Sequence, residues 1–297
     1  MLKFKPLTID DKSIFDKYLA GYNFDTCEYS FTTLLIWRKG CDVSYTLIDD
    51  AIVIKKTGFD GNYYFMQPIG YTKDNLEHIV EELAKYASEN NMPNLFCDAE
   101  ESFLNDMKEL YGERIKVKED VDNFDYIYDT QKLITLSGKK LHSKKNHYNK
   151  FIKTYNYKTK DFFEPGVKDD FIKAAETWYE KKNSDDKYLY YELEGIKELC
   201  SNMKLLNLKA LAVYVDDEIS GFTIGEKMNE DTAIIHIEKG LPNIDGIYTF
   251  INKYFVENYL SDVKYINREQ DLGLEGLRKA KKSYRPVKMG KKYCINL

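Results

Sequence analysis

The stretch that decides the fold runs from Asn267 to Pro286 and reads NREQDLGLEGLRKAKKSYRP. It follows a short apolar segment, 263–266, that is typical of a buried strand. The stretch opens with acidic residues, passes Gly273 and Gly276, and ends in a segment whose charges are all basic. A strand that ends in carboxylates and continues into a cationic helix is more typical of an active-site rim than of a packed core. The alternative is an ordinary strand–loop–helix connection with a solvated helix face.

The length and composition indicate a folded protein with more than one domain. The chain has 297 residues, so we expect two domains of about 150 residues each. Hydrophobic residues make up 43% of it and aromatic residues 14%, which excludes global disorder. The N-terminus lacks a signal-peptide core, and no uncharged apolar run reaches about 18 residues. We therefore expect a soluble, cytoplasmic protein without a transmembrane segment.

The five cysteines are scattered along the chain and form no C-x-x-C pair, and the four histidines do not supplement them. These spacings predict neither a disulfide framework nor a zinc site, and we expect no metal. A reducing cytosol is the compartment that fits this cysteine usage.

The charge is distributed unevenly. The formal net charge is −5, yet residues 138–160 hold eight lysines, two histidines and no acid, and residues 276–297 hold eight further Lys and Arg and no acid. We expect the first of these stretches, over 137–155, to be helical. Purely basic stretches in an acidic protein indicate a local anionic partner, which could be phosphate, nucleic acid or a lipid headgroup. The alternative is two solvated helix faces that never meet.

The two halves of the chain repeat one another. The turn Asp49-Asp50 between apolar strands recurs as Asp216-Asp217, which predicts a hairpin in each half. The following segments recur after nearly the same interval along the chain: strands that end before Gly70 and Gly240, helices over 73–90 and 247–259, and strands over 94–97 and 264–267. A near-constant offset across so many elements indicates a tandem duplication of an α+β unit.

The order of these elements is that of a GNAT-type acyltransferase domain. We therefore predict an α+β fold of two tandem GNAT-like domains, residues 1–130 and 131–297, each with a mixed sheet flanked by helices. In that fold two parallel strands splay apart, and the helix after the first strand directs its N-terminus at the phosphates of an acyl carrier.

The turn that would bind this acyl carrier departs from the GNAT pattern. Residues 243–248 read NIDGIY, so Asp245 intrudes and Tyr248 fills the last of the positions that are normally small. An anionic side chain and a bulky ring both disfavour a pyrophosphate. We therefore expect no acetyl-CoA and no other cofactor, and a different activated acyl donor is favoured.

Polar side chains at the two strand ends suggest where chemistry could occur. His236 and Glu238 lie two residues apart and are expected to share one face of their strand, and Asn267 and Glu269 do likewise on the next strand. Glu238 and Glu269 would then converge where the strands splay and could hold a positively charged amino group. The alternative for His236 is a core histidine whose hydrogen bonds are satisfied.

The 267–286 stretch, together with Glu238-Lys239-Gly240 and the basic segment 138–151, resembles the C-terminal domain of phosphatidylglycerol lysyltransferases. The resemblance covers essentially the whole chain. It implies a tandem GNAT fold and the transfer of an aminoacyl group from a charged tRNA to a lipid; the Fem-type peptidoglycan aminoacyl ligases are structural cousins. The membrane-bound members carry a multi-span domain before this unit, which this sequence lacks. A lipid, a peptide or a small molecule therefore all stay open as acceptors, as does a peripheral contact with a membrane.

The resemblance and the strand ends together define a candidate site in the second domain. Glu238, Glu269 and Asp271 are assigned to the aminoacyl ammonium or to the acceptor proton, with His236 as a further catalytic candidate. The expected substrate-binding residues, most of them cations for tRNA phosphates, are Asn267, Arg268, Arg278, Lys281, Lys282, Arg285, Lys144, Lys145 and Lys150. The first-half counterpart, 94–102, keeps acids but has no cationic helix, so we expect a single active site.

Two other functions remain open from the sequence. One is a GNAT-type N-acyltransferase that uses acyl-CoA on a small amine. The other is a non-catalytic module that binds RNA or an anionic membrane through the two basic stretches.

Overall fold

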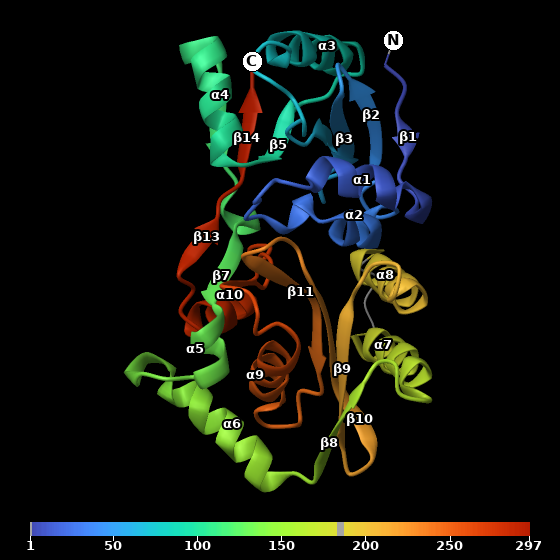
Figure 1. Cartoon of the computed structure of the whole chain (residues 1–297), viewed down its shortest axis with the longest axis vertical. Coiled ribbons are helices and arrows are strands. Elements are labelled where there is room, and N and C mark those ends of the chain that lie inside the picture. The colour runs from blue at the N-terminus through green and yellow to red at the C-terminus, as the bar shows by residue number, and fades with distance from the viewer. Residues whose placement is uncertain (1, 183–186) are drawn as a thin grey trace. The chain divides into compact units, whose positions relative to one another are not determined.

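The computed structural model describes residues 2–182 and 187–297. The chain folds into two compact units: a first unit that extends up to Phe124 and includes Gly290–Leu297, and a second unit, Asp125–Met289. Each unit contains one seven-stranded sheet (Figure 1). Among the described residues, no helix combines the length and apolar composition that a membrane span needs.

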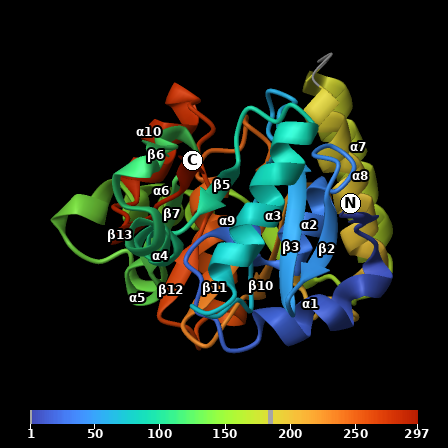
Figure 2. The same ribbon diagram turned by 90° about the horizontal axis from the view of Figure 1, so that it is seen from above.

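The first unit covers its sheet with helices. The strands lie in the order β1 (Lys5–Pro6), β2 (Ser44–Ile48), β3 (Ala51–Thr57), β4 (Tyr63–Phe65), β5 (Phe96–Ala99), β14 (Tyr293–Asn296) and β6 (Lys116–Glu119). The helices are α1 (Lys12–Leu19), α2 (Phe31–Trp37), α3 (Leu76–Glu89) and α4 (Glu101–Tyr111). Leu76, Ile79 and Leu83 recur at helical spacing, so α3 buries one apolar stripe against the sheet. Figure 2 shows α3 lying along β2 and β3.

The second unit repeats this arrangement. Its strands lie in the order β13 (Lys288–Gly290), β7 (Asp125–Asp129), β12 (Tyr265–Asn267), β11 (Thr232–Gly240), β10 (Glu218–Lys227), β9 (Lys209–Val215) and β8 (Tyr157–Asp161). Its helices are α5 (Thr130–Thr135), α6 (His142–Thr154), α7 (Val167–Lys182), α8 (Lys187–Asn202), α9 (Ile247–Tyr259) and α10 (Glu275–Ser283).

Helices cover both faces of the second sheet. On one face Phe250 of α9 joins the core and stacks on Phe151 of α6, with ring centroids 4.4 Å apart. A Cβ on Gly221 of β10 would meet α9. The next residue, Phe222, instead packs against Phe171 of α7, with ring centroids 4.9 Å apart. Because successive strand residues point to opposite faces, α7 covers the face away from α9.

The repeat predicted from the sequence is present in the structure. Both hairpin turns adopt the left-handed conformation at both central residues, with φ of 47° and 64° at Asp49-Asp50 and 50° and 67° at Asp216-Asp217. A two-residue turn of type I′ requires positive φ at both positions, and Asp tolerates it better than most residues. The helix predicted over 247–259 is α9, and the basic segment predicted to be helical contains α6.

Two strands lie on the other side of the domain boundary from the one predicted. We expected residues 131–297 to form the second domain, but β14 lies between β5 and β6 in the first sheet. Conversely, β7, before the expected boundary at residue 130, lies between β12 and β13 in the second sheet. These strands pair with segments far away in the sequence, so no local pattern indicates their placement.

The placement of β14 also brings two cysteines together. Cys97 of β5 and Cys294 of β14 form a disulfide, although they are 197 residues apart in the sequence. The expectation that the cysteines would stay unpaired is therefore wrong for this pair, because their spacing gave no hint that their strands are neighbours. Cys27, Cys41 and Cys200 are buried and take part in no disulfide between described residues.

Candidate active site

The candidate site lies where two parallel strands of the second sheet separate. Thr232–Ile234 of β11 pair with Tyr265–Asn267 of β12, and beyond this point β11 continues to Gly240 paired with β10 but no longer with β12. The chain after β12 turns away at Glu269, whose φ is 57°. Side chains from the two diverging segments contact one another across the gap: Arg268 contacts Glu238, and Glu269 contacts His236.

A β-bulge shapes this part of β11. Ile224 of β10 lies opposite Ile237, but the next residue, Gly225, lies opposite Ile235, so His236 is an extra residue without a partner in the strand pairing. Bulges re-aim side chains and are frequent next to active sites. The expectation that His236 and Glu238 share one face by simple alternation is therefore wrong at this point.

His236 lies between two carboxylates. Its Nδ1 is 3.1 Å from Glu269 Oε1 and its Nε2 is 3.1 Å from Glu226 Oε1. Burial alone would lower the pKa of His236, but the hydrogen bonds to Glu226 and Glu269 outweigh it and raise the pKa to about 9. The ring is therefore an imidazolium at neutral pH, with both nitrogens donating. Glu226 was missed from the sequence, although it follows a predicted strand that pairs with the His236 strand.

Arg268 and Glu238 form a buried ion pair in the same region. Arg268 Nη2 donates to Glu238 Oε1 at 2.6 Å, and each side chain is only 12% exposed. The guanidinium lies 4.6 Å from the ring centroid of Tyr284 and 5.6 Å from that of Tyr128. Burial opposes the charge of Arg268, yet Glu238 outweighs it and raises the pKa of Arg268. Glu238, expected to hold a substrate cation, thus already holds one from the protein.

Two residues that contact Glu238 each have one buried polar atom without a hydrogen-bond partner among the described residues. Asn252 of α9 donates from Nδ2 to Glu238 Oε2 at 3.1 Å. Its Oδ1, and Nη1 of Arg268, are buried and have no hydrogen-bond partner among the residues that the structure describes. Buried donors and acceptors are nearly always satisfied in native proteins, so an unpaired donor and an unpaired acceptor beside one carboxylate indicate space for a polar ligand.

Asp271 and Arg278 neutralise one another. Arg278 donates to both carboxylate oxygens of Asp271 at 2.8 Å, and Tyr126 donates to one of them at 2.6 Å. Burial would raise the pKa of Asp271, but Arg278 and Tyr126 lower it to about 2. Asp271 was expected to meet the aminoacyl ammonium or the acceptor proton, and Arg278 to meet tRNA phosphates; in the structure they join the β12–α10 loop to α10.

Among the cations of α10, Lys281 is buried. Its ammonium donates to the backbone carbonyls of Arg268 and Glu269, and burial followed by the charge of Arg268 lowers its pKa to about 8. Lys281 therefore fixes the backbone of the segment that carries the site. Lys282 and Arg285 are exposed.

The first basic stretch contributes one residue to this region. Lys144 of α6 lies 4.3 Å from the ring centroid of Tyr284, and burial and then Arg268 lower its pKa. The two basic stretches therefore do meet, at the C-terminal end of α10. Lys145 is exposed, whereas Lys150 is paired with Asp245 at the other end of α6.

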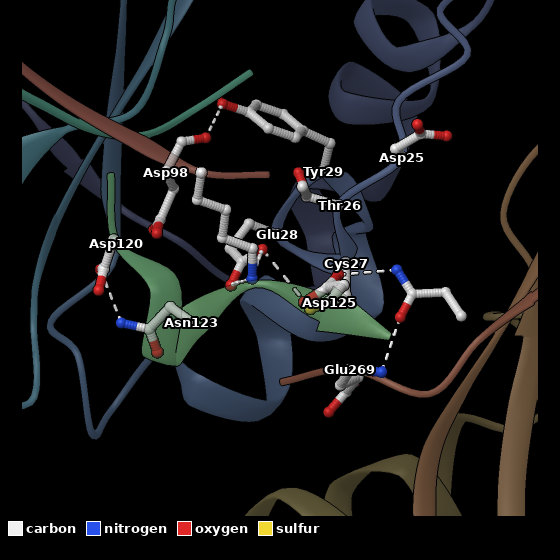
Figure 3. A network of polar contacts seen from close by, with 12 residues as sticks. Asp25, Thr26, Cys27, Glu28, Tyr29, Asp98, Asp120, Asn123, Asp125 and Glu269 are labelled. Carbon is white, nitrogen blue, oxygen red and sulfur yellow. Dashed lines mark hydrogen bonds and ion pairs between the residues drawn. The ribbon is translucent and has the colours of Figure 1, made fainter. Parts of the chain in front are cut away.

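Asn267 has a structural role at the end of β12. Its Nδ2 donates to Asp125 of β7 at 2.7 Å, and its Oδ1 accepts from the backbone N–H of Glu269 at 2.6 Å (Figure 3). The side chain is fully buried and supports the turn at Glu269.

The N-terminus of α9, where GNAT enzymes bind an acyl carrier, is covered by α6. A Cβ on Gly246 would lie 2.4 Å from the carbonyl oxygen of His147, and the backbone N–H of Asp245 donates to the hydroxyl of Tyr155 at 3.1 Å. Gly246, with φ of 81°, is required for this close approach. The helix end that would bind a pyrophosphate is therefore occupied by the protein itself.

Comparison with known proteins identifies the family. The sequence profile of the family "Phosphatidylglycerol lysyltransferase, C-terminal" matches residues 19–296, and the chain belongs to this family. An uncharacterized protein of Mycoplasmoides gallisepticum is 28% identical over 202 residues, or 66% of this chain; the match spans 65% of that relative's own length.

Solved structures share the fold. A protein of unknown function from Bacteroides thetaiotaomicron is 31% identical over 99% of both chains, with a TM-score of 0.89. The L-PGS structure from Bacillus licheniformis is 15% identical over 96% of this chain and 91% of its own, with a TM-score of 0.64. A tandem GNAT protein of clavulanic acid biosynthesis is 9% identical over 99% and 97%, with a TM-score of 0.52. The predicted α+β fold of two tandem GNAT-like units is confirmed.

Proposed function

We propose that the protein is an aminoacyltransferase that moves an amino acid from aminoacyl-tRNA to a lipid or another acceptor with a hydroxyl or amino group. Membership of the phosphatidylglycerol lysyltransferase family supports a transferase. The observation that carries the proposal is the unpaired donor of Arg268 and the unpaired acceptor of Asn252 beside Glu238. An aminoacyl ester offers the complement, because its carbonyl oxygen accepts hydrogen bonds and its ammonium group donates them.

In this reaction the acceptor attacks the carbonyl carbon of the ester, and the ribose oxygen of the tRNA leaves from a tetrahedral intermediate. Nη1 of Arg268 would donate to the oxygen that gains negative charge in that intermediate. Asn252 Oδ1 and Glu238 would hold the ammonium group and so orient the ester. The guanidinium is fixed between two tyrosine rings and needs little reorganisation.

Glu269 is the proposed acceptor for the proton of the attacking group, and it would return that proton to the leaving ribose oxygen. His236 cannot accept it at neutral pH, because its pKa of about 9 keeps the ring protonated. His236 instead would position the Glu269 carboxylate, with Glu226 fixing the other ring nitrogen.

The exposed cations near the meeting point of α6 and α10, namely Lys145, Lys282 and Arg285, would contact tRNA phosphates. Such contacts give affinity without a choice of sequence, so they name no amino acid. A peripheral membrane contact in the cytoplasm would fit a lipid acceptor. The acyl-CoA alternative is disfavoured, because α6 covers the N-terminus of α9.

A transfer assay tests the proposal. Purified protein is mixed with radiolabelled aminoacyl-tRNAs and either phosphatidylglycerol vesicles or cell extract, and the fraction that takes up label is identified. We expect Arg268→Lys, which keeps the charge but loses the planar fork whose second nitrogen is Nη1, to lower the transfer rate about 100-fold. Arg278→Lys is the matched control and should retain most activity, because its partner Asp271 lies outside the proposed ester site.

Retention of labelled tRNA on filters at two salt concentrations completes the test. Aminoacyl-tRNA binding by wild type should weaken with salt, and Arg268→Lys should leave it unchanged. Salt-dependent tRNA binding without any transfer by the wild type would instead support a non-catalytic RNA-binding module.

A further inference from the structure

A cleft of about 380 Å³ lies between α7 and the ends of β10 and β11 in the second unit. This volume is typical of sites for small molecules. Thr177 and Trp178 of α7, Ser220 of β10 and Lys239 of β11 belong to its lining. None of these residues belongs to the proposed aminoacyl site.

The cleft and the aminoacyl site lie on opposite faces of the same sheet. Glu238 contacts Asn252 of α9, whereas the next residue, Lys239, forms an ion pair with Glu192 of α8 at 2.8 Å. Lys239 also lies 3.9 Å from the ring centroid of Trp178 of α7. Adjacent strand residues point to opposite faces, so a molecule in the cleft would not meet the Arg268–Glu238 pair.

The shape of the cleft follows from the sequence of α7. The helix presents two rows of residues at i, i+4 spacing to it, Asp170–Ala174–Trp178 and Lys173–Thr177–Lys181. The middle member of each row is small, which leaves space over Ser220 and Gly221 at the start of β10. The lysine row forms one rim.

Charged side chains of both signs line the cleft: the acids Asp170, Asp217 and Glu218, and the cations Lys173, Lys181 and Lys239. Asp217 pairs with Lys158 at 2.7 Å and Lys239 with Glu192 at 2.8 Å, while Tyr214 donates to Asp170 at 2.5 Å without neutralising it. Lys173 takes part in none of the ion pairs between described residues. A free ammonium at the rim of a cleft favours an anionic group.

One end of the cleft is apolar. Trp178, Phe222 and Lys239 also line an adjoining void of about 10 Å³. The rest of that lining is largely apolar and comes from α7 and α8: Ala175, Tyr179, Leu189, Glu192, Leu193 and Ile196. A ligand with an apolar body would therefore place it toward Trp178 and Phe222.

We infer that this cleft binds a small amphipathic anion, with a carboxylate or phosphate group at Lys173 and Lys181 and an acyl or flat apolar body against Trp178. This site is independent of the proposed transfer reaction, since it neither contains nor contacts the residues assigned to that reaction.

Fluorescence of Trp178 tests the inference. The chain has two tryptophans, so a Trp37→Phe background leaves Trp178 as the single emitter. Octanoate and octyl phosphate are titrated at constant ionic strength, with octylamine as the cationic control. We expect a saturable change in emission with one or both anions and none with octylamine; which anion binds more tightly distinguishes a carboxylate from a phosphate.

Two variants locate the binding. Lys173→Glu combined with Lys181→Glu should weaken binding about tenfold or more, because two attractions become repulsions. Ala174→Leu should also weaken binding, because the larger side chain fills the centre of the cleft. Lys168→Glu, an exposed charge reversal in α7 outside the lining, should leave binding unchanged. Equal binding of octylamine, no saturable response, or unchanged affinity in the double lysine variant would overturn the inference.

Discussion

The two units place charged side chains at the same point of the repeated fold but pair them differently. In the first unit Lys56 of β3 binds Asp98 of β5 directly at 2.9 Å. The second hairpin strand of each unit, β3 or β10, and the strand after the repeated helix, β5 or β12, are the corresponding elements; Glu226 lies on β10, and Glu269 follows β12. Asp98 and Glu269 share a left-handed backbone, with φ of 54° and 57°. In the second unit His236 separates two carboxylates in place of a direct ion pair.

The two units differ in whether the buried polar atoms around these charges all have hydrogen-bond partners. Asp98 accepts from Tyr64 at 2.7 Å, and its backbone carbonyl accepts from Tyr29 at 2.7 Å (Figure 3). No atom of this network, nor of the Glu226–His236–Glu269 cluster, is among the unpaired buried polar atoms of the described residues. In the second unit, however, Arg268 and Asn252, which both contact Glu238, each have one such atom. The first unit therefore uses its charges for stability, whereas the second has capacity left for a ligand at Glu238.

The largest effect should come from breaking the closed pair of the first unit. Asp98→Asn keeps a residue that tolerates positive φ but leaves the Lys56 ammonium buried without its counter-charge. We expect the free energy of unfolding, measured by urea denaturation, to fall by about 4 kcal/mol. The double variant Lys56→Met with Asp98→Asn should recover much of that loss.

The matched control is Asp217→Asn, which removes one partner of the exposed Lys158–Asp217 pair at another positive-φ position. It should leave the urea midpoint unchanged, because exposed ion pairs contribute little. Equal losses of unfolding free energy from Asp98→Asn and Asp217→Asn would show that the buried pair stabilises the protein no more than the exposed pair does.

In the second unit the corresponding test is pH dependence. His236 has a pKa of about 9 in the folded protein against 6.5 for the ordinary group. Because the folded value is the higher one, its stabilising contribution is complete below pH 6.5 and disappears as the pH rises through about 9. This contribution is at most about 3 kcal/mol, given about 1.36 kcal/mol per pKa unit. Urea unfolding at pH 6 and pH 10 measures it.

His236→Gln is the control, since glutamine keeps polar groups but does not titrate. Lys281 titrates in the same range with the opposite sign, because its folded pKa of about 8 lies below the ordinary 10.5. Lys281 is present in both proteins, so the difference between their pH profiles isolates His236. Parallel profiles would mean that the imidazolium between Glu226 and Glu269 contributes nothing.

The sequence predicts the parts of this site that depend on local pattern. The paired aspartates mark both hairpins, and the strand end that carries Glu269 follows from one apolar segment and its repeat. The bulge at His236 is different, because it depends on the register between β10 and β11, and simple alternation misplaces the side chain. Likewise, composition cannot tell which lysine of α10 is buried; only packing selects Lys281.

The two C-terminal strands, β13 and β14, are beyond local prediction for a related reason. Both are short, and β13 carries the polar Lys288 beside Met289 and Gly290, so neither shows a clear strand pattern. Their pairing partners lie far away in the sequence, as the Cys97–Cys294 bridge with its separation of 197 residues illustrates. Non-local pairing determines these strands, and it also determines where the units begin and end.

The smallest effect should come from the feature that the units share most closely. Asp50 and Asp217 occupy the second turn position of their hairpins with φ of 64° and 67°, where a glycine has no Cβ to strain. Asp50→Gly and Asp217→Gly should each raise the thermal midpoint by about 1–2 °C, since the relief of strain slightly exceeds the added chain entropy of the unfolded state. Differential scanning calorimetry of the two single variants and the double variant measures this. The turns belong to different units, so their effects should add. A stabilisation in one unit and a destabilisation in the other would show that the two turns, despite equal dihedral angles, no longer have equivalent surroundings.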